Sequence, residues 1–198
     1  PKEIASLTWA FATMKMKHDL VETVSGFILK AEKQSLAGFQ EQDLSTLTWG
    51  FASLRLRDES LFNAIGLEVA EKLPTFSLPG IVCTLWSFAS LRVTPSFLDM
   101  AIHHLKFGRL ADKLEPRGCS MLLWSLATLR SHGPDVELFY YHLAERCILP
   151  RVQRFHGQDI SNCLWAFATA RIQHEATFTA LARQSLPAMS GFTSQALA

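Results

Sequence analysis

The sequence lacks the motifs that carry catalysis or hold a metal ion. It contains no C-x-x-C pair, no glycine-rich phosphate loop and no G-x-S-x-G nucleophile turn. His103 and His104 are poor metal ligands as a pair, because adjacent helix residues point about 100° apart and no distant partner accompanies them. We therefore expect a protein that is not an enzyme and that uses no cofactor and no metal.

The sequence also has no large excess of positive or negative charge. The formal net charge is +1, whereas nucleic-acid-binding proteins are usually more basic, although a neutral total can hide a local basic stripe. The longest uncharged run, residues 73–91, is interrupted by Pro79 and Gly80, so we expect a buried loop and helix there and no membrane insertion.

The sequence has few cysteines, and no two of them are closely spaced. The four cysteines are Cys83, Cys119, Cys147 and Cys163. Three of them lie inside a repeated phrase, at positions that other copies fill with non-cysteine residues. We interpret all four as buried reduced thiols, with a disulfide or metal role as the less favoured alternative.

What the sequence does contain is one phrase repeated five times. "LTWAFATMK" at 7–15 returns as "LTWGFASLR", "TLWSFASLR", "LLWSLATLR" and "CLWAFATAR". Each copy holds one of the five tryptophans, which are Trp9, Trp49, Trp86, Trp124 and Trp165. Their separation of about 40 residues is typical of a stacked-repeat protein.

The phrase has helical periodicity. Apolar residues recur five and two positions before each tryptophan and two and five positions after it, which forms one stripe of an α-helix. Small residues follow the tryptophan on a second side, so neighbouring helices can approach closely. A turn and a second amphipathic helix come next, with Asp58, Thr94-Pro95 or Gly133-Pro134 at its start. This pattern predicts an all-α fold, a right-handed α-solenoid of about five helix-turn-helix repeats of 37–41 residues.

The repeats divide the chain into one continuous array. A buried anchor, Phe39, Phe76, Leu114 or Phe155, precedes each later tryptophan by ten residues. The predicted repeats span residues 1–36 (incomplete at its N-terminal side), 37–73, 74–111, 112–152 and 153–189, and 190–198 starts a sixth with Phe192 as its anchor. We expect further repeats, and any targeting segment, to lie outside these 198 residues.

The phrase L-x-W-[AGS]-F-A-[ST]-L-[KR], preceded by F-x-x-Q-D-[LI], resembles a known group of repeats. These are the octotricopeptide repeats of green algae and the heptatricopeptide repeats of apicomplexans, with similar arrays in proteins that carry a RAP domain. The resemblance implies paired helices and RNA binding in a mitochondrion or, alternatively, a plastid. The Pro-Pro-Pro-Glu-Trp signature of algal second helices and a RAP domain are both missing, which favours the heptatricopeptide side.

A basic residue follows each tryptophan by six positions. These residues are Lys15, Arg55, Arg92, Arg130 and Arg171. One cation per repeat at a constant place predicts a ladder for RNA phosphates. The alternative is structural: a cation near a helix C-terminus interacts with the helix dipole and with free carbonyls. The two roles are compatible.

Two further positions of the first helix vary among the copies. Three residues before the tryptophan stand Ser6, Thr46, Cys83, Met121 and Asn162. Among the residues seven before it are Gln42, Arg117 and Gln158. In proteins that recognise one RNA base per repeat, the base-contacting positions vary while the rest of the repeat stays constant. These positions are therefore candidate base-reading residues, although an unconstrained surface varies equally.

The tryptophans themselves are interpreted as packing residues between repeats, with base stacking as the alternative. The leading hypothesis is a non-catalytic organellar protein that binds single-stranded or structured RNA, in RNA processing or stability or within an organellar ribosome. The second is a protein-binding scaffold in a large organellar complex, supported by the near-neutral charge.

Overall fold

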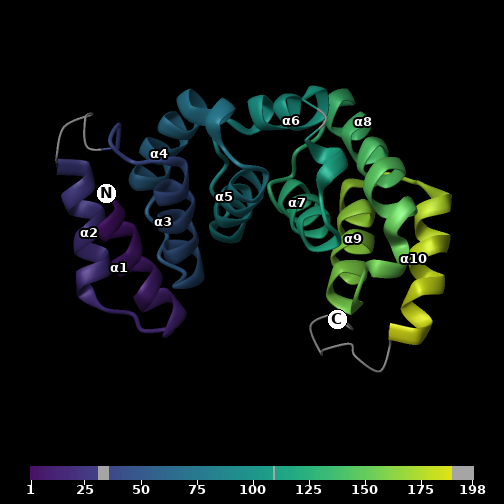
Figure 1. Ribbon diagram of the computed structural model, residues 1–198, viewed down its shortest axis with the longest axis horizontal. Helices are drawn as coiled ribbons and strands as arrows, with labels where there is room; N and C mark the ends of the chain where they lie inside the picture. The colour runs from purple at the N-terminus through teal and green to yellow at the C-terminus, as the bar shows by residue number, and fades with distance from the viewer. Residues whose placement is uncertain (31–35, 109, 189–198) are drawn as a thin grey trace. The chain divides into compact units, whose positions relative to one another are not determined.

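The chain folds into helices, as the periodicity predicts. The computed structural model describes residues 1–30, 36–108 and 110–188, and these ranges contain no strand. Figure 1 shows helices joined by short connections. Two compact units, Pro1–Ala101 and Ile102–Ala198, make up the chain and are described separately. The predicted anchor Phe192 lies outside the described residues, and the repeat boundaries stay predictions.

The first unit consists of alternating helices. Their bounds are α1 (Lys2–Thr13), α2 (Asp19–Lys30), α3 (Glu41–Ser53), α4 (Glu59–Lys72), the short 3₁₀ turn η1 (Leu73–Thr75) and α5 (Leu78–Leu91). Helix α1 packs against α3, α3 against α5, and α2 against α4. Each tryptophan phrase therefore forms an A helix, and the amphipathic segment after it forms a B helix.

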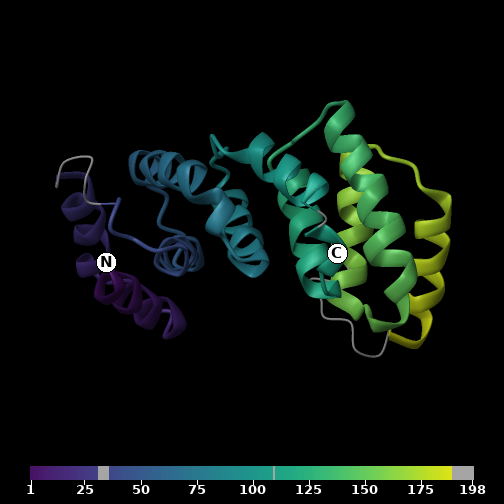
Figure 2. The same ribbon diagram turned by 45° about the horizontal axis from the view of Figure 1, so that its top comes forward.

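The second unit repeats the arrangement. It holds the A helices α7 (Pro116–Thr128) and α9 (Gly157–Ala170), the B helices α8 (Pro134–Leu143) and α10 (Glu175–Ala188), and the short elements η2 (Ala111–Lys113), η3 (Ala144–Ile148) and η4 (Leu149–Arg154). Helix α7 packs against α9, and α10 packs against α9 and η4. Figure 2 shows α10 beside the preceding helices from a second direction. Helix α6 (Leu98–Phe107) divides between the two units. Stacked helix pairs thus confirm the solenoid-like all-α prediction within each unit.

The predicted apolar stripe supplies core residues in α3, α5, α7 and α9, whereas in the first repeat Met14 of the stripe is 69% exposed. In α3 its members Leu44, Leu47, Phe51 and Leu54 are buried. In α5, Phe88 lies edge-on against two other buried rings, at 4.8 Å from Phe62 and 5.5 Å from Phe97 between ring centroids. The expected loop anchors are buried as well: Phe39, Phe76, Leu114 and Phe155. Burial of this stripe against the B helices is the main stabilising term.

Small residues let consecutive A helices approach closely. A Cβ atom at Gly50 of α3 would lie 2.5 Å from Thr8 Cγ2 and 3.2 Å from the Thr8 carbonyl oxygen of α1. Any larger residue at Gly50 would push these two helices apart. The small residues after the tryptophan therefore set the spacing between repeats.

In three repeats a polar side chain near the end of the repeat donates hydrogen bonds to backbone carbonyls near its start. We call this set of bonds the clasp, and the repeat pattern does not predict it. Near the end of each repeat, Lys72 Nζ donates to the Ala37 and Phe39 oxygens, both at 2.7 Å. Arg151 donates likewise to the Asp112 and Leu114 oxygens, and Gln184 to the Gln153 and Phe155 oxygens. Each donor holds the carbonyl of the anchor residue and the carbonyl two residues before it. These side chains satisfy loop carbonyls that would otherwise lack partners.

The helix starts agree with the sequence in part. Asp58 is the N-cap of α4, and its carboxylate accepts a hydrogen bond from the Leu61 N–H at 2.9 Å. Asp43 and Asp159 lie at the third position of α3 and α9 and accept hydrogen bonds from the N–H groups of Gln40 and His156. This is the reverse half of a capping box. Within the described residues, the helices are each too short or too polar to cross a membrane.

Candidate nucleic-acid interface

All five A helices end in the same way. In α3, the Arg55 N–H donates to the Ala52 oxygen and the Leu56 N–H donates to the Phe51 oxygen, both at 3.0 Å. The same pair of bonds closes α1, α5, α7 and α9. This is the Schellman motif, in which the residue just past the helix adopts the left-handed conformation.

The left-handed residue is always the predicted cation. The φ angles are 54° at Lys15, 56° at Arg55, 55° at Arg92, 53° at Arg130 and 57° at Arg171, and these are the only non-glycine residues with positive φ that the structure describes. Glycine is the ordinary residue at this point of the motif, because a Cβ in the left-handed region costs about 1–2 kcal/mol. The chain accepts this cost at every A helix.

The charged groups at these positions make no internal contact. All five side chains are exposed, and none donates a hydrogen bond or forms an ion pair with a residue in the described ranges. Lys72 and Arg151, by contrast, bind backbone carbonyls. Backbone N–H groups already satisfy the carbonyls at the A-helix ends, so the carbonyl-capping role considered for these cations is filled without their side chains. Only the weaker interaction with the helix dipole remains for them.

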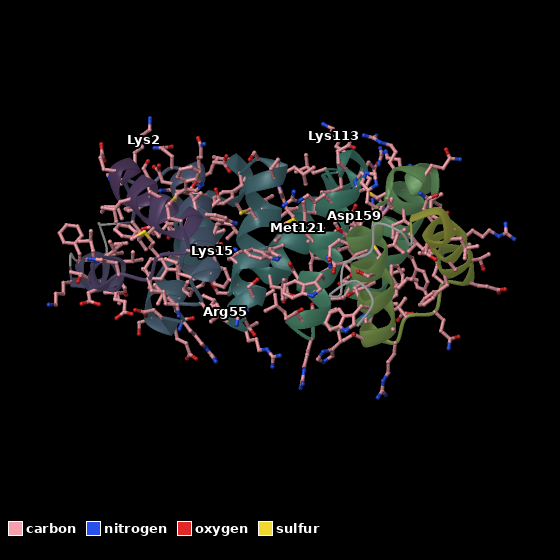
Figure 3. All side chains as sticks on the ribbon, turned by 90° about the horizontal axis from the view of Figure 1, so that it is seen from below. Lys2, Lys15, Arg55, Lys113, Met121 and Asp159 are labelled. Carbon is pink, nitrogen blue, oxygen red and sulfur yellow. The ribbon has the colours of Figure 1, made fainter. Side chains whose placement is uncertain are left out.

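Within the first unit, Lys15 and Arg55 follow the C-terminal ends of two A helices that pack together. Figure 3 shows Lys2, at the start of α1, near one edge of that unit, and Lys15 and Arg55 toward the other. The C-terminal ends of α1 and α3 therefore present their cations on the same side. This placement follows from the packing of α1 against α3 with the same direction and length.

The candidate base-reading residues lie along the A helices. Ser6 is exposed, Thr46, Cys83, Met121 and Asn162 are half-buried, and Gln42, Arg117 and Gln158 are exposed. In α9 two of them contact each other, because Gln158 Nε2 donates to Asn162 Oδ1 at 2.9 Å. In the first unit, Thr46 and Cys83 line one hollow of about 250 Å³ together with Trp9, Ser45 and Trp49.

The tryptophans lie at the surface rather than in the core. Trp9 is 50% exposed and Trp165 is 46% exposed, and Trp49, Trp86 and Trp124 are half-buried. Packing between repeats is real for one pair, since the Trp124 and Trp165 rings lie 6.4 Å apart. The sequence interpretation of these residues as packing residues is therefore incomplete, because each also presents ring surface to solvent.

All four cysteines are free thiols, and three of them agree with the predicted burial. Cys119, Cys147 and Cys163 are buried, and Cys83 is half-buried at the hollow. A hydrogen bond with Cys119, together with burial, raises the pKa of the Cys147 thiol, and burial raises the pKa of the Cys83 thiol to about 11. The Cys147 and Cys83 thiols are therefore neutral at physiological pH. Among the described residues, no three His, Cys, Asp or Glu side chains are arranged to hold a metal ion.

Stacked helix pairs, each A helix followed by an exposed cation, define a class: a helical-repeat protein with one such cation per repeat. The match to protein families gives a narrower assignment. Over residues 1–198 the chain matches the model of the RNA-editing substrate-binding complex 6 protein family, and it belongs to that family. This family differs from the octotricopeptide, heptatricopeptide and RAP groups, so that resemblance is confirmed only as far as an RNA-associated helical protein. A search of curated proteins finds no similar sequence.

Sequence reasoning found the cations but not their conformation. The signal was present in the sequence. In four repeats an apolar residue stands seven positions after the tryptophan: Met16, Leu56, Val93 and Ile172. Its backbone N–H bonds to the oxygen of the phenylalanine that stands two positions after the same tryptophan. Such a pair flanking the end of a helix is typical of the Schellman motif. Its presence predicts a left-handed residue at the cation.

Proposed function

We propose that this chain is a non-catalytic RNA-binding helical-repeat protein that holds RNA within an RNA-editing complex. The observation that carries the proposal is the set of five exposed, unpaired cations in left-handed conformation at the A-helix ends. A strained backbone position occupied by the same kind of side chain in every repeat points to a role for that side chain. Family membership supports RNA as the ligand.

Phosphate groups are the RNA feature that suits these cations. Four of the five are arginines, and the planar guanidinium forms two parallel hydrogen bonds with a phosphate. Because neighbouring A helices within a unit pack against each other, consecutive cations contact consecutive segments of one backbone. The variable residues at positions three and seven before the tryptophan are the proposed base contacts.

The direct test is binding of the purified chain to a single-stranded RNA oligonucleotide, followed by fluorescence anisotropy at several salt concentrations. If all five cations neutralise phosphates, the logarithm of the affinity falls against the logarithm of the salt concentration with a slope of about −3.5. Absence of binding, or an affinity independent of salt, would overturn the proposal. A duplex RNA of the same sequence shows whether structured RNA is accepted too.

The organelle is proposed as the mitochondrion, with the plastid as the alternative. The support is the resemblance of the A-helix phrase to organellar repeats and the RNA-editing family. Of the RNA-processing roles considered, family membership favours editing over a ribosomal role. Imaging of the full-length tagged protein checks this, and a cytosolic or nuclear signal would contradict it.

A second candidate function is that of a scaffold for other protein subunits. It is favoured by large apolar side chains exposed on the B helices: Phe27 is 61% exposed, Leu67 is 64% exposed and Phe107 is 63% exposed. Such residues on a helix face suit protein contacts. If protein partners remain bound to the chain after ribonuclease treatment, the scaffold role is supported. Loss of every partner on that treatment would argue against it.

A further inference from the structure

The tryptophan of each A helix shares one face with the candidate base contacts. Positions seven and three before the tryptophan, the tryptophan itself and the position four after it lie within about 60° around a helix of 3.6 residues per turn. The last of these positions is always serine or threonine: Thr13, Ser53, Ser90, Thr128 and Thr169. We call this face, with one such set from each A helix, the tryptophan ridge.

The ridge offers flat ring surface and free hydrogen-bonding groups. None of the five indole N–H groups donates a hydrogen bond within the described part of the chain, and Trp9 and Trp165 are about half exposed. Two hydroxyl oxygens on the ridge, Ser90 Oγ and Thr128 Oγ1, are shielded from solvent and have no partner among the described residues. Because both oxygens are shielded from solvent, they are not among the groups that the ridge offers to a ligand.

In the first unit, ridge residues from neighbouring A helices line an open hollow. Its lining combines the rings of Trp9 and Trp49 with Ser45, Thr46 and Cys83, from α1, α3 and α5. The candidate base contact of one repeat therefore lies beside the tryptophan of the repeat before it. At about 250 Å³, the hollow is of a size to receive a planar ring system. Two of its lining residues are aromatic, and two carry hydroxyl groups.

In the second unit the corresponding rings contact each other directly. The Trp124 and Trp165 centroids are 6.4 Å apart, with a 31° angle between the planes. Tilted pairs at this distance are within the favoured range for aromatic contacts. The two tryptophans of this unit therefore present adjoining ring surfaces.

We propose that the tryptophan ridge is a stacking platform for unpaired nucleobases. The base of a nucleotide stacks on the tryptophan, and the cation at the end of the same A helix holds its phosphate. The inference rests on the proposed RNA-binding function and assigns the part of the RNA that each row contacts. In each repeat the cation follows the tryptophan by six residues, or about 9 Å along a helix. That distance lies within the reach of a nucleotide, whose base and phosphate flank one sugar.

A nucleobase suits this face better than an apolar protein segment. Stacking needs an exposed π face, which Trp9 and Trp165 supply most fully, and it tolerates any base. Specificity then falls to the neighbouring variable residues, such as Thr46 and Asn162, whose polar atoms suit the edges of an unpaired base. A helix from a protein partner would instead require an unbroken apolar stripe, and the ridge alternates indoles with hydroxyl, amide and charged groups.

The test compares two probes of equal length, a single-stranded RNA and an abasic oligonucleotide that has the sugar-phosphate backbone without bases. All five tryptophans of the chain lie on the ridge, so tryptophan emission reports contact with it directly. RNA should quench this emission at saturation, whereas the abasic probe should bind by its phosphates and leave it nearly unchanged. Equal quenching by both probes, or none by either, would contradict stacking.

Variants then identify the ring that matters. Trp9→Ala is expected to weaken RNA binding about 5-fold or more, in line with the cost of losing one stacked base, and to change abasic binding less than 2-fold. Trp9→Phe retains a π face and should restore most of the affinity. The matched control is Phe27→Ala, which removes an equally exposed aromatic ring from the B helix α2 and should leave both affinities unchanged.

The outcomes separate this inference from the proposed function. If the chain binds both probes with strong salt dependence but Trp9→Ala has no effect, the platform is refuted and the phosphate contacts stand. If neither probe binds, both are refuted. If Phe27→Ala weakens binding as much as Trp9→Ala does, the RNA contacts the B helices instead, and the platform is again refuted.

Discussion

The A helices and the B helices of this chain differ in what they expose. The large apolar side chains that lie strongly exposed within the described A helices are tryptophans, Trp9 and Trp165. The B helices instead expose scattered aliphatic and phenylalanine side chains, among them Leu20, Phe27, Leu29, Leu67, Met100, Phe107, Leu138 and Leu186. The A layer repeats one phrase, and the B layer repeats only its amphipathic spacing.

This difference separates two kinds of constraint. An A helix must pack on the A helices of its neighbours, end in a Schellman motif and present a cation, which leaves few free positions. A B helix has to cover one side of the core, so any apolar residue of suitable size serves. The repeated phrase therefore combines packing and binding in one helix, and the two can be separated by substitution.

The largest expected effect is on the core of the A layer. Phe88→Ala removes a fully buried ring that contacts Phe62 and Phe97, and should lower the free energy of unfolding by about 3–5 kcal/mol. The control Phe27→Ala, in the B layer, should change it by less than about 0.5 kcal/mol. Urea titration followed by circular dichroism measures both. Similar losses for the two variants would show that the layers do not differ in packing.

Two glycines test the spacing between repeats. Gly50→Ala places a methyl group against Thr8 of the neighbouring A helix and should destabilise the chain by about 1–3 kcal/mol. Gly26→Ala, in the B helix α2, meets nothing within 4 Å and should stabilise it by about 0.5–1 kcal/mol, because alanine favours the helix. The same urea titration checks both. A stabilising effect of Gly50→Ala would contradict the close approach of α1 and α3.

A smaller effect separates binding from stability at the A-helix ends. Arg55→Gly relieves left-handed strain of about 1–2 kcal/mol but gives the unfolded chain about 0.4–1 kcal/mol more entropy. We expect the free energy of unfolding to stay level or to rise by up to about 1 kcal/mol. The RNA salt slope should become less steep by about 0.7.

The control for this change is Lys30→Asn, an exposed cation at the end of the B helix α2. It should leave the salt slope unchanged. If Arg55→Gly instead lowers the free energy of unfolding by 1 kcal/mol or more, the cation serves the helix rather than a ligand.

The smallest expected effect concerns Cys83. Because burial raises the pKa of its thiol to about 11, its thiolate fraction at pH 9 is about 50-fold lower than that of an ordinary cysteine. Alkylation should therefore be slow at pH 9 and accelerate as the pH rises toward 11. Since Cys83 lines the hollow, saturating RNA should slow it further, as measured by mass spectrometry of the labelled peptide. Labelling that is unaffected by RNA would place the bases elsewhere.

The repeat was predictable because packing acts at every copy. The apolar stripe, the small residues such as Gly50 and the buried anchors such as Phe39 all follow from helical spacing and recurrence. The five cations were predictable as a series for the same reason. Periodicity alone is enough to assign these positions to helix faces.

Other features depend on contacts that spacing does not encode. The clasp donors are of three residue types: Lys72, Arg151 and Gln184. What they have in common is only that each donates to equivalent backbone carbonyls. Trp9 is half exposed, whereas its neighbour Thr8 lies at the close approach of α1 and α3. Recurrence of a large aromatic residue alone suggested packing, and only the three-dimensional arrangement shows its free face.

The central claim is that the left-handed cations hold RNA phosphates, and one comparison of salt slopes tests it most directly. The test variant replaces Lys15, Arg55, Arg92, Arg130 and Arg171 with asparagine, which tolerates the left-handed conformation and carries no charge. The control variant makes the same change at five other cations, Lys30, Lys113, Arg146, Arg154 and Arg183, so that both lose five positive charges. The account predicts a slope near zero for the first variant and about −3.5 for the second and for the wild type. Equal slopes for the two variants would contradict it.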